Sequence, residues 1–157
     1  MAAGVTLRKD ALAAFRAYLE ETLGPAVAAA RRDSALLIDG AISARAATPK
    51  FVTMIARAGP FGSGNPEPIV ALPAHTVVYA EEVGQAHVRA RLRSPDGAFL
   101  NAIAFRAVGQ PLGRSLLGSR GTAVHAAGAL QLDRWNGSER VQMRLVDLAV
   151  INGGVRS

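Results

Sequence analysis

Alternation of apolar and polar residues dominates the second half of the sequence and restricts its fold more than any other feature. Five strand-like runs follow one another, at roughly 76–83, 86–93, 98–105, 122–132 and 140–151. The turn Pro95–Gly97 joins the second run to the third, and Asn136-Gly137, a strong hairpin signal, lies between the last two. A connection containing LGRSLLG separates the third run from the fourth and predicts a short helix. This order predicts an all-β OB-fold barrel of five strands, with a small SH3-like barrel as the nearest alternative.

The beginning of the sequence has helical rather than strand-like periodicity. Thr6 is placed to cap a helix that runs to about Leu23, with apolar residues recurring at helical spacing. Gly24 and Pro25 are expected to end this helix, and a short Ala-rich helix to Arg32 is expected to follow.

One strand and one further helix are predicted before residue 60. The segment ALLIDG, residues 35–40, has the composition of a buried strand closed by a turn. Thr48 and Pro49 form a cap and first-turn pair, and an apolar stripe follows until Gly59-Pro60 ends the helix. Residues 1–58 are therefore predicted to be an α+β piece that belongs to a larger domain.

A segment rich in glycine and proline, GPFGSGNPEP, separates this piece from the strands. Glycine allows backbone turns that a Cβ would prevent, and proline fixes φ, so we expect a semi-rigid joint over residues 59–74. The barrel would then occupy residues 75–152. The segment is either a joint without chemistry or a joint that also touches ligand, through Gly59, Pro60, Phe61, Gly62, Gly64, Asn65 and Pro66.

Composition and charge favour a cytoplasmic protein with a polyanionic partner. Half of the residues are apolar, cysteine is absent, and neither a signal peptide nor a membrane-spanning run is present in the sequence. The formal net charge is +6, and nearly all the cations are arginine. Residues 1–70 hold eight basic and six acidic residues, whereas residues 71–157 hold ten and six. The second half is therefore the expected nucleic-acid-binding part.

The second strand-like run, HVRARLRS, separates basic from apolar residues with a period of two. One face of this strand is therefore predicted to be core and the other a basic ladder. Guanidinium groups at this spacing can follow a phosphate backbone, and the second and third strands form the usual binding face of an OB-fold. A solvated strand face is the alternative interpretation of the three residues, Arg89, Arg91 and Arg93.

The hairpin between the last two runs, DRWNGSER, offers a second predicted contact region. Trp135 can stack on a base there, or it can instead pack across the hairpin and stiffen it. Arg134 and Arg140 are predicted to meet phosphates, and Arg144 is predicted to extend the basic face. Asn101 on the third run is a candidate for an additional polar contact.

Other chemically interesting residues are expected to have structural roles. His125 lies among small apolar residues, which favours a hydrogen-bonded structural histidine, and His75 is assigned no role. Asp39 and Asp147 follow apolar runs and are predicted at turns or strand ends. The phenylalanines predicted in the core are Phe15, Phe51, Phe99 and Phe105.

The segment GPFGSGNPEP closely resembles the signature PFGxGNPEP of the RecJ family, the single-strand-specific DNA exonucleases of the DHH phosphoesterase superfamily. In that family the signature precedes a C-terminal OB domain. LLIDG and TPKFVTMIARAGPFG resemble the family's strand and helix before the signature. HVRARL, NAIAF and VHAAGALQLDRWNGSERVQMRLVDL resemble strands that follow it. The resemblance covers almost the whole chain and implies that residues 1–58 are the C-terminal part of a DHH-associated domain.

The catalytic motif of that superfamily is absent from this sequence. Its Asp-His-His motif and further aspartates bind two Mn²⁺ or Mg²⁺ ions, whereas no histidine here follows an aspartate or another histidine. The family's GGH-x-MAAG motif is represented only by its second half, MAAG, at residues 1–4. The resemblance therefore implies a chain without metal, cofactor or catalytic group that starts inside the DHH-associated domain. The partner that it implies is the Mn²⁺- or Mg²⁺-dependent DHH catalytic region of the same enzyme.

The resemblance implies the single-stranded-DNA-binding part of a 5′–3′ exonuclease that acts in DNA repair and recombination. This chain alone is expected to be inactive as a nuclease. The main alternative is a barrel that serves as a structural brace or protein-docking module without direct DNA contact. The aligned arginines of HVRARLRS favour DNA binding, because a docking barrel does not need a cationic strand.

Overall fold

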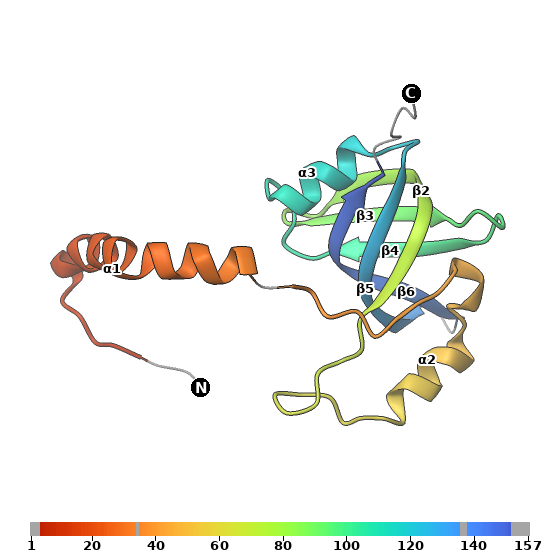
Figure 1. Ribbon diagram of the computed structural model, residues 1–157, viewed down its shortest axis with the longest axis horizontal. Helices are drawn as coiled ribbons and strands as arrows, with labels where there is room; N and C mark the ends of the chain where they lie inside the picture. The colour runs from red at the N-terminus through yellow and green to blue at the C-terminus, as the bar shows by residue number, and fades with distance from the viewer. Residues whose placement is uncertain (1–3, 34, 136–137, 152–157) are drawn as a thin grey trace. The chain divides into compact units, whose positions relative to one another are not determined.

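The computed structural model describes residues 4–33, 35–135 and 138–151 (Figure 1). The chain forms two compact units, Met1–Leu37 and Ile38–Ser157. The domain boundary predicted at residue 58 concerns a longer protein and stays a prediction. In this chain, helix α2 (Pro49–Ala56) belongs to the second unit. Among the described residues, no helix is long and apolar enough to cross a membrane.

The first unit consists of the 3-10 helix η1 (Lys9–Ala11) and the helix α1 (Leu12–Asp33). The predicted helix end at Gly24-Pro25 is wrong, because α1 continues through Pro25 to Asp33. An interior proline removes one backbone donor and crowds the carbonyl of the preceding turn, but the alanine-rich sequence after it strongly favours helix. The predicted Thr6 cap is also wrong, since the helical turns begin at Lys9 without a side-chain cap.

The predicted buried strand at residues 35–40 is not present. Only β1 (Gly40–Ala41) pairs, in parallel with the start of β2 (Val70–Val83), and residues 35–40 are exposed. Leu37 is 83% exposed. Apolar composition shows what a segment is able to bury, but the described residues offer these side chains no cover.

The second predicted helix is confirmed as α2, which follows the short 3-10 helix η2 (Ala44–Ala46). Its cap is the predicted one, because the Phe51 N–H donates to Thr48 Oγ1 at 3.2 Å. Pro49 occupies the first turn, where its missing N–H has no intrahelical acceptor. Val52 is buried in the core and Phe51 packs against it, so α2 is anchored to the barrel by its apolar stripe.

The barrel contains β2, β3 (His87–Arg93), β4 (Phe99–Ala104), β5 (Ala123–Trp135) and β6 (Ser138–Val150). Neighbouring strands pair in the order β2-β3-β4-β6-β5, and pairing of β2 with β5 closes the barrel. The pair β4–β6 is parallel, and the other barrel pairs are antiparallel. The predicted five-stranded OB-fold is therefore confirmed. The first strand starts six residues earlier than predicted, at Val70.

Helix α3 (Pro111–Gly118) lies between β4 and β5, as predicted, and closes one end of the barrel (Figure 1). Its Leu116 is fully buried, and Gly113 approaches the preceding loop so closely that a Cβ would lie 2.0 Å from the Ala107 carbonyl oxygen. The core includes at least one buried residue from each barrel strand: Leu72, Val77, Val88, Ala90, Leu92, Ala102, Val124, Ala129, Met143 and Leu145.

Candidate nucleic-acid interface

Strand β3 has one buried face and one basic face, as its sequence predicts. Val88 and Leu92 are fully buried, and Ala90 is nearly so. Arg89, Arg91 and Arg93 alternate with these residues and are exposed. The strand pleat therefore lines up three guanidinium groups on the outer surface of the barrel.

The neighbouring strands add their own side chains to this surface. In the register, Arg91 lies opposite Tyr79 of β2 and Asn101 of β4. Directly opposed residues of an antiparallel pair project to the same side of the sheet. The surface around the basic ladder therefore holds polar and aromatic groups as well as cations, and Asn101 projects to the same side as Arg91.

Arg89 is neutralised by an acidic neighbour that sequence reasoning missed. Its guanidinium forms an ion pair with Glu81, which lies opposite it on β2. A hydrogen bond with Tyr79 lowers the pKa of the Glu81 carboxyl, and the bond with Arg89 adds to this effect. The same contact with Glu81 raises the pKa of the Tyr79 hydroxyl. The pair could have been found from the spacing of β2 and β3 once their register was known.

Arg91 contacts an aromatic ring on the same surface. Its guanidinium carbon lies 4.4 Å from the centroid of the Phe99 ring, within cation–π distance. Phe99 is 48% exposed, so its predicted place in the core is wrong. The reason is register: Phe99 lies opposite Arg93, and both side chains project outward. The outer surface therefore has an aromatic group that sequence reasoning did not assign to it.

Two hollows adjoin on this surface and share Arg91 and Asn101. The first has a volume of about 370 Å³ and contains Phe99 and Arg140 among its lining residues. The second has a volume of about 420 Å³ and is lined by Arg89 together with Tyr79. We call the two hollows together the outer groove. Cationic, aromatic and amide side chains meet along it, together with the carboxylate of Glu139 in the first hollow.

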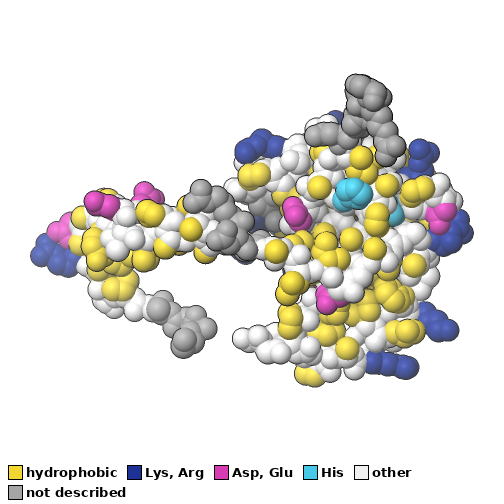
Figure 2. All heavy atoms as spheres, viewed as in Figure 1, with side chains coloured by type: hydrophobic (Ala, Val, Ile, Leu, Met, Phe, Trp, Pro, Cys, Tyr) yellow, Lys and Arg dark blue, Asp and Glu magenta, His cyan; other side chains and the backbone are white. Residues whose placement is uncertain are grey.

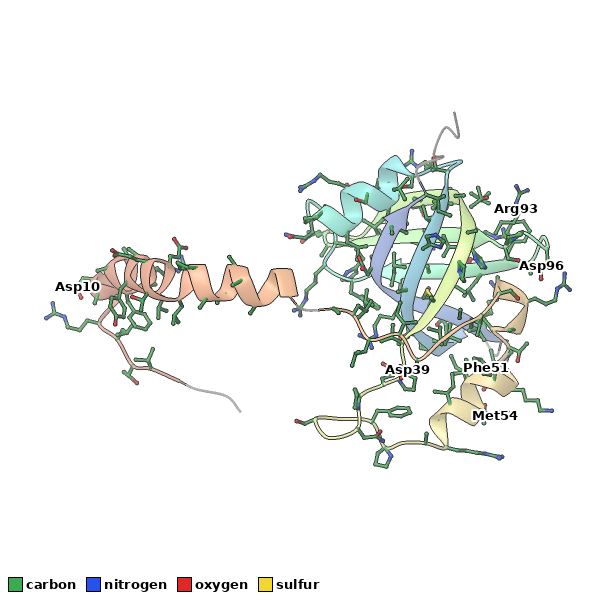
Figure 3. All side chains as sticks on the ribbon, viewed as in Figure 1. Asp10, Asp39, Phe51, Met54, Arg93 and Asp96 are labelled. Carbon is green, nitrogen blue, oxygen red and sulfur yellow. The ribbon has the colours of Figure 1, made fainter. Side chains whose placement is uncertain are left out.

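Arg93 lies beyond the lining of both hollows and has no ion pair among the described residues. In Figure 3 its side chain extends from the barrel near the turn that carries Asp96. That turn places Gly97 at a positive φ of 84°, where glycine is favoured. Basic side chains mark the margin of the barrel in Figure 2.

The predicted hairpin residues are only partly described. β5 and β6 pair up to Trp135 and Ser138, as expected for the predicted hairpin. The side chains of Arg134 and Trp135, and the turn residues 136–137, lie outside the described part of the chain. Arg140 lines the first hollow.

Arg144, predicted to extend the basic face, projects from the adjoining part of β6. It lies opposite Ile103 of β4, but its guanidinium forms an ion pair with Glu67. The structure therefore brings Arg89, Arg91 and Arg140 to the outer groove, and it pairs Arg144 with an acidic residue from the Gly/Pro-rich segment.

That segment is held by hydrogen bonds that centre on Asn65. Its backbone exchanges two bonds with Gly62, and its side-chain Nδ2 donates to the carbonyl oxygens of Ala58 at 2.9 Å and Pro60 at 3.1 Å. The peptide bond between Gly59 and Pro60 is cis. The segment thus folds into a small reversed loop, and its amide side chain joins the loop to the end of α2.

The histidines serve structure. His75, which the sequence left without a role, is buried: its Nε2 accepts from the Ala44 N–H at 3.1 Å and its Nδ1 lies 2.8 Å from the Pro73 carbonyl oxygen. These partners assign the proton to Nδ1. His125 accepts from the Ala74 N–H at 3.3 Å through Nδ1, but it is exposed on the barrel. Phe105 is 47% exposed against His87, so its predicted core position is also wrong.

The described residues do not form a metal site. No group of three or more histidine, cysteine, aspartate or glutamate side chains among them is arranged to hold an ion. The Mn²⁺ or Mg²⁺ pair that the RecJ resemblance implies for an intact enzyme therefore does not fit the described part of this chain.

The strand order and the outer groove define an OB-fold domain. A family model described as the RecJ OB domain matches residues 38–147, and the chain belongs to this family. A search of curated proteins gave no match.

Solved structures of RecJ share this fold. The crystal structure of RecJ in complex with Mg²⁺ from Thermus thermophilus has 23% sequence identity and a TM-score of 0.52, over 92% of this chain. The Mn²⁺ complex from the same organism has 23% identity and a TM-score of 0.50 over 92% of this chain. The present chain spans 21% of the first RecJ chain and 20% of the second.

Proposed function

We propose that the barrel binds single-stranded DNA along the outer groove, as the C-terminal binding part of a RecJ-like 5′–3′ exonuclease. The observation that supports this most directly is the meeting of Arg91, Phe99, Asn101 and Arg140 in one hollow. Guanidinium groups bind phosphates, and aromatic rings stack on bases that a duplex would keep paired. A surface that offers both kinds of contact side by side suits a single strand better than a duplex.

In this proposal the nuclease activity is a property of the longer protein and not of this chain alone. RecJ family membership supports a role in DNA repair and recombination, and the catalytic centre would lie in a DHH region outside this sequence. That region would hold the Mn²⁺ or Mg²⁺ ions, since the described residues here lack a suitable ligand group. The role proposed for this chain is to hold the substrate strand.

Fluorescence anisotropy with a labelled oligo-dT strand tests the proposal. The parent chain should bind in low salt, with affinity that falls as salt rises, because phosphate contacts release counterions. Removal of one phosphate contact should reduce the slope of log affinity against log salt by about 0.7. Arg91→Ala should weaken binding and lower this slope. Arg16→Ala, an exposed arginine on α1, removes the same charge outside the barrel and should leave both quantities nearly unchanged.

A structural brace or docking module is the second candidate function, and two ion pairs favour it. Arg89 pairs with Glu81 and Arg144 with Glu67, so part of the basic surface is already neutralised within the chain. Failure of the parent chain to bind oligo-dT in low salt would favour the brace, whereas folded Arg91→Ala protein with parental affinity and salt slope would reject Arg91 as a phosphate contact. Circular dichroism checks that the variant is folded.

A further inference from the structure

Phe99 is the outward-facing aromatic side chain of the outer groove whose ring contacts a guanidinium. A single exposed apolar residue needs no functional explanation. Phe99 differs because Arg91 lies against its ring and because the ring forms part of a defined hollow. The guanidinium lies over one face of the ring, so a flat partner would have to stack on the other face.

The hollow around Phe99 has the chemistry of a nucleobase site. Its volume of about 370 Å³ is at the lower end of the roughly 300–1,000 Å³ typical of ligand pockets. Ala47 and Pro49 contribute apolar surface, and Asn101 contributes an amide with both donor and acceptor groups. On the side that β6 forms, Arg140 adds a cation and Glu139 a carboxylate. A flat ring with a polar edge, attached to a phosphate, matches these groups.

We propose that Phe99 is the platform on which one base of the bound strand stacks, with Asn101 placed at the edge of that base. This inference rests on the proposed binding of single-stranded DNA and specifies where a base is held. Arg91 has two roles in it: it orients the Phe99 ring and carries positive charge toward the adjacent phosphate. The platform is on a barrel strand, so it does not depend on Trp135 in the hairpin.

The test compares oligo-dT with an abasic strand of the same length, which has the same phosphates but no bases. Phe99→Ala should weaken binding to oligo-dT by about 5- to 150-fold and leave the salt slope unchanged, because stacking carries no counterion term. Affinity for the abasic strand should not change. Phe99→Trp should retain tight binding to oligo-dT, since a larger ring stacks at least as well.

Phe105→Ala is the matched control, because Phe105 is also half exposed but lies against His87 outside both hollows. It should bind both strands like the parent. Thermal unfolding followed by circular dichroism shows whether each variant is folded.

The outcomes separate this inference from the proposed function. Failure of the parent to bind either strand would reject DNA binding altogether, and the base site with it. Parental binding of oligo-dT by folded Phe99→Ala would reject only the stacking platform. Equal weakening on both strands would also reject it, because Phe99 would then act only through the position of Arg91. If the hollow instead serves protein docking, Phe99→Ala should have parental affinity for both strands.

Discussion

Glu81 should act as an internal competitor for DNA, and its removal should strengthen binding. In the chain as it stands, the Glu81 carboxylate pairs with Arg89 on the outer groove. A phosphate that approaches Arg89 must share or replace this carboxylate and is repelled by its charge. Glu81→Gln keeps the shape of the side chain and an oxygen that can accept from Tyr79, but it removes the charge. The Arg89 guanidinium then becomes available to a phosphate.

The expected size of the effect follows from counterion release. One additional neutralised phosphate steepens the slope of log affinity against log salt by about 0.7 for a single strand. Between about 0.15 M and about 0.05 M salt, that difference alone increases the affinity of the variant relative to the parent by about twofold. Anisotropy titrations with oligo-dT across this range measure both the affinity and the slope.

Two controls make the result decisive. Glu82→Gln removes an equal charge from the next residue of β2, which has no ion pair among the described residues, and should leave the salt slope nearly unchanged. Because Glu81 raises the pKa of Tyr79, Glu81→Gln should lower that pKa in an ultraviolet titration, with Tyr18 as the second tyrosine of the chain. A lowered Tyr79 pKa together with unchanged DNA affinity and salt slope would refute the idea that Glu81 competes with phosphate for Arg89.

Two further predictions concern stability. A hydrogen bond from the Ser94 hydroxyl, then the Ala98 N–H and the Arg45 guanidinium, lower the pKa of Asp96 from 3.8 to about 2. A carboxyl whose pKa is lower in the folded state loses its stabilising effect as the pH falls from about 4 through about 2. The melting temperature of Asp96→Asn should therefore depend less on pH in this range than that of the parent. Equal pH dependence of the two proteins would contradict the lowered pKa of Asp96. Gly128→Ala should lower the free energy of unfolding, measured by chemical denaturation, by about 1–3 kcal/mol, because its Cβ would lie 2.3 Å from a backbone oxygen of β6. Parental stability would show that the backbone can shift at the irregularity in the β5–β6 pairing between Ala127 and Gly128.

The barrel was predictable because each of its strands carries its own signal in the sequence. Alternation and turn residues located the five strands, and the period of two in β3 separated its arginines from the core. Phe99 was assigned wrongly because its residue type outweighed its position. It has the same parity as Asn101, and the next residue, Leu100, is the buried one. Parity along the strand would have placed Phe99 correctly.

Other features depend on contacts between distant residues, which a local pattern does not contain. The role of His75 comes from a backbone donor at Ala44, 31 residues earlier in the chain. The pairing of Arg144 with Glu67 joins positions 77 residues apart. Exposure of Leu37 depends on what surrounds the segment and not on its composition. Such properties follow from the assembled fold, since they require knowing which strands become neighbours.

The strict alternation along β3 makes the chemistry of the outer groove independent of the stability of the barrel. Exchanging the outward residues alters no buried contact, so this strand could exchange basic for acidic or neutral side chains while its core remained the same. The strand is equally sensitive to length: deletion of one residue would turn the arginines inward and the valine and leucine outward. Substitutions at these positions can therefore change what the protein binds gradually, whereas an insertion or deletion would abolish the fold and the binding surface together.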